Sequence, residues 1–189
     1  MTATVSALNG VDVTRLVDTV NAIKTDPSLA DFQFRAHTEW EGGGKSRTTI
    51  KEFVHAGSPD TSRTKAFELI GDEPEVLLGS NAGPNAVEAA LSALASCLAV
   101  GYAYNAAARG IAIEKLAFDL EGDLDLRGFL GLDSSIRPGF GAIRLTWSVE
   151  SEAPRQQLEE LCDYVQQTSP VLDLLRNPVP VSVSMAPGP

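Results

Sequence analysis

Cysteine and histidine are scarce in this sequence of 189 residues, which has two of each. The cysteines, Cys97 and Cys162, are far apart and form no Cys-x-x-Cys motif. Two cysteines cannot supply a disulfide framework for a chain of this length, and we expect free thiols, as in a reducing compartment. With His37 and His55 as the only histidines, a tetrahedral zinc site is not expected either, so we predict no metal and no cofactor.

Basic side chains are also in deficit. There are 15 Lys and Arg against 25 Asp and Glu, which gives a formal net charge of −10. Nucleic acids and anionic membrane surfaces both select clusters of Lys and Arg, so neither is an expected partner. The segment from Met1 to Ser6 lacks a basic start followed by an apolar stretch. We therefore expect no signal peptide and a cytoplasmic location.

Charge is missing altogether between Glu88 and Arg109. A spanning helix needs about 20 strongly apolar residues, but this run is rich in Ala and Ser and contains Asn105, so we expect a buried helix and no membrane contact. Gly83-Pro84 marks its start and Gly110 its end. Such a helix is roughly 36 Å long. One small domain cannot cover it on every side, which favours a partner subunit.

The rest of the chain predicts an α+β fold. Residues 10–24 show helical spacing and end at Asp26-Pro27, so we treat residues 1–27 as a helical appendage and 28–189 as the main domain. Two helices are expected in the last third of the chain: an amphipathic one over 154–167 and a short one that Ser169 caps and Pro170 begins. Alternating apolar residues predict strands over 32–40, 48–54, 65–70, 111–123, 142–150 and 179–185, with the first three as an antiparallel meander and a loop over 57–62.

Two segments resemble a known family. They are Gly83-Pro84-Asn85-Ala86-Val87-Glu88…Ala95-Ser96-Cys97 and Thr168-Ser169-Pro170-Val171. With the element order around them, they are similar to the OsmC/Ohr family of osmotically inducible and organic hydroperoxide resistance proteins, over roughly residues 32–185. The resemblance implies antiparallel sheets wrapped around two long central helices in an intertwined homodimer. It also implies a thiol peroxidase of the oxidative stress response that reduces organic hydroperoxides.

The resemblance gives Cys97 the role of reactive cysteine, because that residue takes the position of the family's helix thiol. Ser169 stands where the family's second, resolving cysteine would be, so this chain looks like a branch that lacks it and needs an external thiol reductant. Without the resemblance, Cys97 reads as a small buried hydrophobe, since free cysteine is among the most buried residues. Cys162 is interpreted as part of a helix core, too far from position 169 to replace the missing cysteine.

The family's helpers of the thiol are a glutamate and an arginine, for which Glu88 and Arg47 are the candidates. In the hydroperoxide-resistance branch the glutamate lies ten residues before the cysteine, which here is Val87, whereas Glu88 lies nine before. Nine residues at about 100° each place Glu88 opposite Cys97 on a regular helix. The alternative is a carboxylate that stabilises the helix start. Arg47 follows the glycine turn at 42–44, with rivals at positions 35 and 63, and the alternative is a solvated charge.

The loop at 127–132 contains Phe129 and Leu130, which could form an apolar lid that binds substrate, or could pack on its own sheet. Two functions are therefore open. One is a peroxidase that uses a single cysteine. The other is a non-catalytic dimer that binds a small apolar ligand or senses oxidants, which the serine at position 169 favours.

Overall fold

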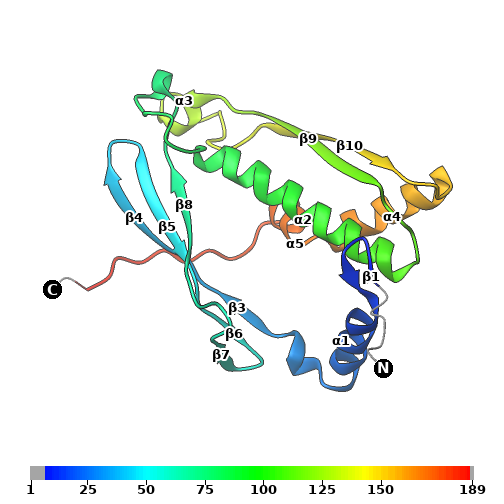
Figure 1. Cartoon of the computed structure of the whole chain (residues 1–189). Helices are drawn as coiled ribbons and strands as arrows, with labels where there is room; N and C mark the ends of the chain where they lie inside the picture. The colour runs from blue at the N-terminus through cyan, green and yellow to red at the C-terminus, as the bar shows by residue number, and fades with distance from the viewer. Residues whose placement is uncertain (1–6, 188–189) are drawn as a thin grey trace. The chain divides into compact units, whose positions relative to one another are not determined.

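A computed structural model of the chain describes residues 7–187 (Figure 1). The chain divides between residues 92 and 93 into two compact units. The expectation that a signal peptide is missing concerns residues 1–6, which lie outside the described residues.

The first unit begins with a hairpin and a helix. Strands β1 (Ala7–Leu8) and β2 (Val11–Asp12) are joined by a tight turn in which Asn9 and Gly10 have φ of 54° and 75°. Helix α1 (Val13–Thr25) follows, then the 3₁₀ helix η1 (Pro27–Ala30). The predicted helix over 10–24 therefore begins at residue 13, because residue 10 is needed in the turn. Its predicted end at Asp26-Pro27 is confirmed.

Six further strands of this unit form two sheets of three. One sheet has the order β3 (Phe32–Phe34), β6 (Phe53–His55) and β7 (Ser58–Asp60). The other has the order β4 (His37–Gly42), β5 (Lys45–Ile50) and β8 (Phe67–Gly71). The prediction of one meander is wrong, because the chain changes sheet at 35–36 and again at 51–52. The prediction of a loop over 57–62 is also wrong, because strand β7 lies within that range.

The loop from residue 72 to 83 carries the chain from β8 toward the long helix and contains the 3₁₀ helix η2 (Glu75–Leu77). The Asp72 side chain is 3% exposed and accepts hydrogen bonds from the Glu73, Ser80 and Ala82 amides and from the Ser80 hydroxyl. Those hydrogen bonds hold the pKa of Asp72 far below its usual range. A Cβ on Gly83 would lie 2.2 Å from the Ile70 carbonyl oxygen, so only glycine allows this approach.

Helix α2 (Ala86–Ala108) crosses the boundary between the units, and the elements that follow it make up the second unit. Strands β9 (Lys115–Asp123) and β10 (Ala142–Glu150) pair along their whole length as an antiparallel hairpin. Helix α3 (Leu126–Phe129) lies in the connection between them, and α4 (Arg155–Thr168) and α5 (Pro170–Arg176) follow. The strand predicted over 142–150 and the two helices are confirmed, while the strand predicted over 111–123 begins at residue 115.

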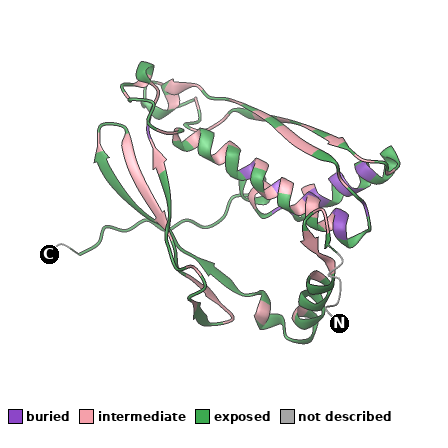
Figure 2. Ribbon diagram, viewed as in Figure 1, coloured by how far each residue is buried: buried purple, intermediate pink, exposed green. Residues whose placement is uncertain are grey.

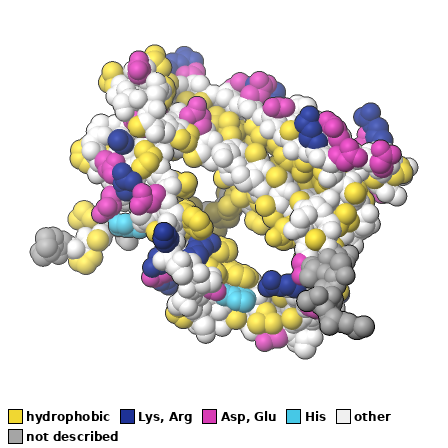
Figure 3. Space-filling model, viewed as in Figure 1, with side chains coloured by type: hydrophobic (Ala, Val, Ile, Leu, Met, Phe, Trp, Pro, Cys, Tyr) yellow, Lys and Arg dark blue, Asp and Glu magenta, His cyan; other side chains and the backbone are white. Residues whose placement is uncertain are grey.

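The hydrophobic core of the second unit lies between α2, α4 and the β9–β10 hairpin. Figure 2 shows its buried positions on both helices. The hairpin turns alternate side chains toward the helices. Its other face carries ion pairs between Arg144 and Glu121 and between Lys115 and Glu150, and Figure 3 shows acidic and basic groups along it. The buried residues that pack together in this core are Leu94, Leu98, Tyr102, Ala106, Ile111, Leu158, Leu161, Cys162 and Val165.

Among the described residues, α2 is the one helix whose length and composition would let it cross a membrane, which is weak evidence for a span. One face of α2 is packed in the core of the second unit through Leu94, Leu98 and Tyr102. The opposite face, with Ser96, Val100 and Tyr104, is exposed in the single chain.

The strand predicted over Val179–Met185 does not form, so this prediction is wrong. No described strand pairs with this segment, and Val181 and Val183 are 78% and 93% exposed. Pro178 and Pro180 lack the N–H groups that a ladder would use. Alternation of apolar residues is therefore present without the hydrogen bonds that define a strand.

Candidate functional site

The Cys97 thiol lies near the middle of α2, on the turn between buried Leu94 and Leu98 and next to the packed face of the helix. It is a free thiol and is partly exposed, in contrast to the buried Cys162. Its side chain shares a hydrogen bond with Ser169, whose Oγ lies 3.3 Å from the Cys97 Sγ. A sulfur in this position is enclosed by protein and still open to solvent.

Ser169 is fixed by the start of helix α5. As the sequence predicts, it is the N-cap of that helix, and Pro170 occupies the first turn. Its Oγ accepts a hydrogen bond from the Leu172 amide at 3.3 Å, and the residue is only 5% exposed. The cap hydrogen bond sets the direction of the serine side chain, so the hydroxyl is held against the cysteine.

Helices α2 and α4 set the separation of the two residues. Gly101 faces Val165, and a Cβ on this glycine would lie 3.1 Å from a methyl carbon of that valine. Cys97 lies one turn before Gly101 on α2, and Ser169 lies one turn after Val165 at the end of α4. The two residues therefore meet next to the Gly101–Val165 contact. The Tyr102 hydroxyl donates to the Leu158 carbonyl at 3.0 Å, and burial raises the pKa of Tyr102 to about 12. A small residue at the crossing and a buried hydrogen bond thus support the site.

Cys162 belongs to the core, as the sequence predicts. Its side chain is 9% exposed and packs in the buried cluster of α2 and α4. Burial raises the pKa of the Cys162 thiol, which favours the unreactive protonated form. The Gln166 amide donates to its sulfur at 3.7 Å. Cys162 therefore acts as a small apolar side chain.

Glu88 is exposed in the first turn of α2 and takes part in a reciprocal cap. The Asn85 amide donates to the Glu88 carboxylate at 2.9 Å, and the Glu88 amide donates to the Asn85 side-chain oxygen at 2.9 Å. This is a capping box with asparagine in place of serine or threonine. A polar residue three positions before a glutamate is the sequence signal for such a cap, and Asn85 with Glu88 provides it.

Arg47 lies on β5 in the first unit, where two carboxylates hold its guanidinium. It donates to Glu41 at 2.6 Å and to Glu68 at 2.9 Å. The hydrogen bond and charge of Glu41, followed by those of Glu68, raise the pKa of Arg47. Of its rivals, Arg35 donates to the Gln33 side chain, and Arg63 lies over the Phe53 and Phe67 rings.

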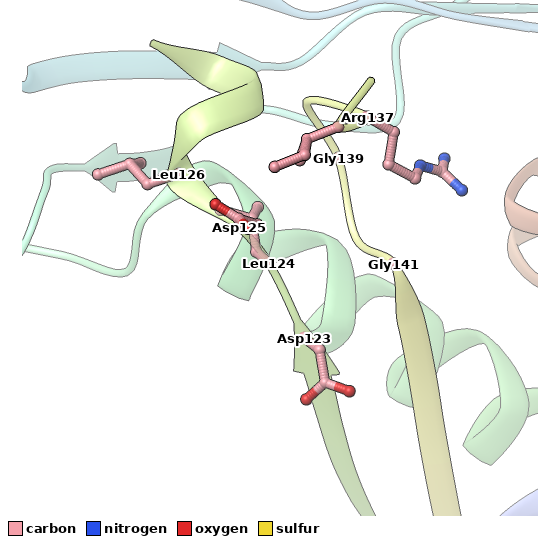
Figure 4. Close-up of a pocket in the computed structure, with 8 residues that line it drawn as sticks. Asp123, Leu124, Asp125, Leu126, Arg137, Gly139 and Gly141 are labelled. Atoms are coloured by element: carbon pink, nitrogen blue, oxygen red, sulfur yellow. The ribbon is translucent and has the colours of Figure 1, made fainter. Parts of the chain in front are cut away.

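The two apolar residues predicted to form a lid lie at the end of α3. Phe129 is 72% exposed and Leu130 is 55% exposed. A pocket of about 410 Å³ lies where the connection leaves β9 and enters β10 (Figure 4), and neither Phe129 nor Leu130 lines it. Asp125 caps α3 there and is paired with Arg127. The pocket is lined by Asp123, Leu124, Asp125, Leu126, Ile136, Arg137, Gly139 and Gly141.

Comparisons with known proteins agree with this architecture. A family model described as OsmC-like protein matches residues 79–184. An OsmC-like protein from Mycoplasma pneumoniae has a TM-score of 0.58 at 20% identity, over 77% of this chain and 89% of its own. An organic hydroperoxide resistance protein from Legionella pneumophila has a TM-score of 0.53 at 16% identity, over 77% and 90%. A comparison with curated proteins finds no match. The predicted α+β class with antiparallel sheets, and the resemblance itself, are confirmed.

Proposed function

The chain belongs to the OsmC-like family, and from that premise we propose that it is a thiol peroxidase that reduces organic hydroperoxides with the single cysteine Cys97. One observation carries the proposal: a partly exposed sulfur on the long helix is held 3.3 Å from a buried hydroxyl. The name of the Legionella pneumophila neighbour, an organic hydroperoxide resistance protein, supports a role in peroxide stress.

In the proposed reaction, the Cys97 thiolate attacks the terminal oxygen of a hydroperoxide. The sulfur–oxygen bond forms as the oxygen–oxygen bond breaks, so two electrons pass from sulfur to the peroxide. The products are a sulfenic acid on Cys97 and an alkoxide, which takes a proton to become an alcohol. The reaction uses the chain's own sulfur and needs no cofactor.

An external thiol must complete the cycle. Ser169 occupies the place from which a second thiol would attack, and a hydroxyl oxygen cannot form a disulfide with Cys97. A first external thiol condenses with the sulfenic acid, which releases water and gives a mixed disulfide. A second thiol displaces the Cys97 thiolate and leaves as the external disulfide. A small thiol or a dithiol carrier in the cytoplasm fits this requirement.

The partner that covers α2 is proposed to be a second copy of this chain. Val100 and Tyr104 are 54% and 48% exposed on the face of α2 opposite the core. A large apolar face of this kind needs cover in water. An intertwined homodimer, in which the α2 helices of two chains lie together, would bury it.

We propose that Arg47 and Glu88 assist the thiol. An arginine beside the thiolate would stabilise it and the departing alkoxide. Arg47→Lys keeps the positive charge between the two carboxylates, and Arg47→Gln removes it. We expect peroxide reduction to fall more in Arg47→Gln than in Arg47→Lys. Glu88→Gln keeps an oxygen for the Asn85 amide. Unchanged activity in that variant would assign Glu88 to the helix cap alone.

A second function is favoured by the same serine. A chain that cannot close a disulfide could use its oxidised Cys97 as a signal, or could bind a small apolar ligand without turnover.

Peroxide consumption separates these functions. The full chain is mixed with cumene hydroperoxide and excess dithiothreitol, and loss of peroxide is followed beside Cys97→Ser and Cys162→Ala. We expect repeated turnover by the wild type and Cys162→Ala, and none by Cys97→Ser. Consumption of one equivalent without turnover would support a sensor. No consumption by a folded protein would contradict the peroxidase.

A further inference from the structure

We infer that Ser169 is a positioning residue for Cys97: its hydroxyl donates a hydrogen bond to the sulfur, both in the thiolate and after oxidation. The part of this inference that concerns oxidised Cys97 rests on the proposed peroxidase function. It assigns a task to the residue that distinguishes this chain from family members with a second cysteine.

The hydrogen-bond inventory of Ser169 supports this direction. A serine hydroxyl has one hydrogen to donate and two lone pairs that accept. The Leu172 amide donates to one lone pair. Within residues 7–187, the Cys97 sulfur is the other hydrogen-bond partner of the hydroxyl, and no buried side-chain oxygen or nitrogen is left without a partner. A buried hydroxyl needs an acceptor for its hydrogen, and the sulfur is placed to provide one.

The chemistry of the sulfur strengthens the same conclusion. While the thiol keeps its proton, either atom of the pair can donate. Once the sulfur has lost its proton, only the serine can. A hydrogen bond to a charged group is about twice as strong as one between neutral groups. Ser169 therefore favours the reactive form of Cys97.

After Cys97 is oxidised, a serine at position 169 behaves differently from a cysteine at the same position. A thiol at position 169 would attack the sulfenic acid, release water and form a disulfide. The hydroxyl cannot reduce sulfur, so the sulfenic acid stays until an external thiol arrives. The serine hydrogen bond keeps it oriented near the surface, since Cys97 is partly exposed. The structure thus favours a sulfenic acid with a long lifetime as the resting oxidised state.

Alkylation of Cys97 tests the hydrogen bond without peroxide. In full-length Cys162→Ala protein, the rate of reaction with iodoacetamide at pH 7 is compared for Ser169→Ala, Ser169→Gly and Ser169→Thr. Without the hydroxyl, the sulfur loses the hydrogen bond that stabilises it in the alkylation reaction, so the rate should fall roughly threefold. Threonine keeps the hydroxyl and should restore the rate.

The neighbouring Thr168 provides the matched control. Its hydroxyl donates to the Tyr164 carbonyl at 2.9 Å and is exposed, so Thr168→Val should leave the alkylation rate unchanged. Alanine at position 169 removes the cap of α5, while glycine retains most of the stability of a cap. Slow alkylation in both variants, with the circular dichroism of the wild type, would separate the hydrogen bond from an effect on the helix.

Ser169→Cys gives a second readout that does not depend on the cap. One equivalent of cumene hydroperoxide should convert Cys97 and the introduced thiol into an intramolecular disulfide, while the wild type accumulates a sulfenic acid that dimedone traps. Wild-type alkylation rates in folded Ser169→Ala and Ser169→Gly would overturn the inference, as would two thiols that stay free in oxidised Ser169→Cys. If alkylation follows the expected order but peroxide leaves Cys97 unchanged, the peroxidase proposal fails and the hydrogen bond stands.

Discussion

The two units of the chain are stabilised in different ways. The second unit buries a continuous set of apolar side chains between α2, α4 and the β9–β10 hairpin. In the described part of the first unit, Asp72 is the one residue that is fully buried. Its sheets instead carry exposed apolar groups such as Trp40 and Leu69, which are 76% and 57% exposed.

This difference shows which unit can hold a reactive group in place by itself. The Cys97–Ser169 pair lies in the second unit, where packed helices determine the distance between the two side chains. The first unit relies on local hydrogen bonds and ion pairs, such as those of Asp72 and Arg47. We expect it to gain its apolar cover from a second chain.

The largest expected effect is on association. Val100→Glu places a charge on the exposed face of α2 that we assign to the homodimer, and burying an unpaired charge is strongly unfavourable. Sedimentation should show a dimer for the wild type and a monomer for the variant. Arg155→Gln, on the exposed side of α4, is the control and should remain a dimer. A monomeric wild type would contradict the proposed cover.

Next in size is the loss of a core side chain. Leu161 is fully buried, so Leu161→Ala should lower the free energy of unfolding by about 2–5 kcal/mol in urea titrations. Leu69→Ala in the first unit should cost less than about 1 kcal/mol, because that side chain is largely exposed. Equal costs would remove the contrast between the units.

Crowding at the crossing of α2 and α4 should have an intermediate effect. Gly101→Leu forces a side chain into the space next to Val165, which overpacks the core and costs about 1–3 kcal/mol. It should also separate Cys97 from position 169. When it is combined with Ser169→Cys, disulfide formation on oxidation should be slower than in Ser169→Cys alone. An unchanged rate would show that this crossing does not determine the separation.

A pH titration examines the polar support of the first unit. The folded-state pKa of Asp72 lies below its usual value because hydrogen bonds stabilise the carboxylate. Its contribution is present above the unfolded-state pKa of about 4 and is lost as pH falls through the folded value. Between pH 6 and 3 the urea midpoint should therefore fall more for the wild type than for Asp72→Asn. Parallel curves would assign the acid sensitivity to other groups.

The smallest expected change in stability is at the proposed lid. Phe129→Ser removes an exposed ring and should change the free energy of unfolding by less than about 0.5 kcal/mol. If this ring contacts substrate, the KM for cumene hydroperoxide should rise while kcat stays the same. An unchanged KM would contradict a contact between Phe129 and the substrate.

Residues near the long helix show what the sequence could predict. The run without charge between Glu88 and Arg109, with Gly83-Pro84 before it, predicted α2 and its need for cover. The short helix after Ser169 was predicted equally well, because a cap residue followed by proline is a local signal. Local residue chemistry determines these two helices, so a single sequence contains enough information to predict them.

The rest depended on contacts between distant residues. The predicted strands over 32–40 and 48–54 run through positions 35–36 and 51–52, and their local composition could not show that the chain passes there from one sheet to another. The same alternation over 179–185 predicted a strand that has no described partner. At the site, the family resemblance pointed to Cys97 and Ser169, but only the packing of α2 on α4 gives their separation.

Intact mass spectrometry shows directly whether a hydroperoxide oxidises Cys97. The wild-type chain is treated with one equivalent of cumene hydroperoxide in the presence of dimedone, with Cys97→Ser and Cys162→Ala beside it. We expect one dimedone adduct, mapped to Cys97, in the wild type and in Cys162→Ala, and none in Cys97→Ser. A folded wild-type protein that stays unmodified, or an adduct on Cys162 alone, would contradict it.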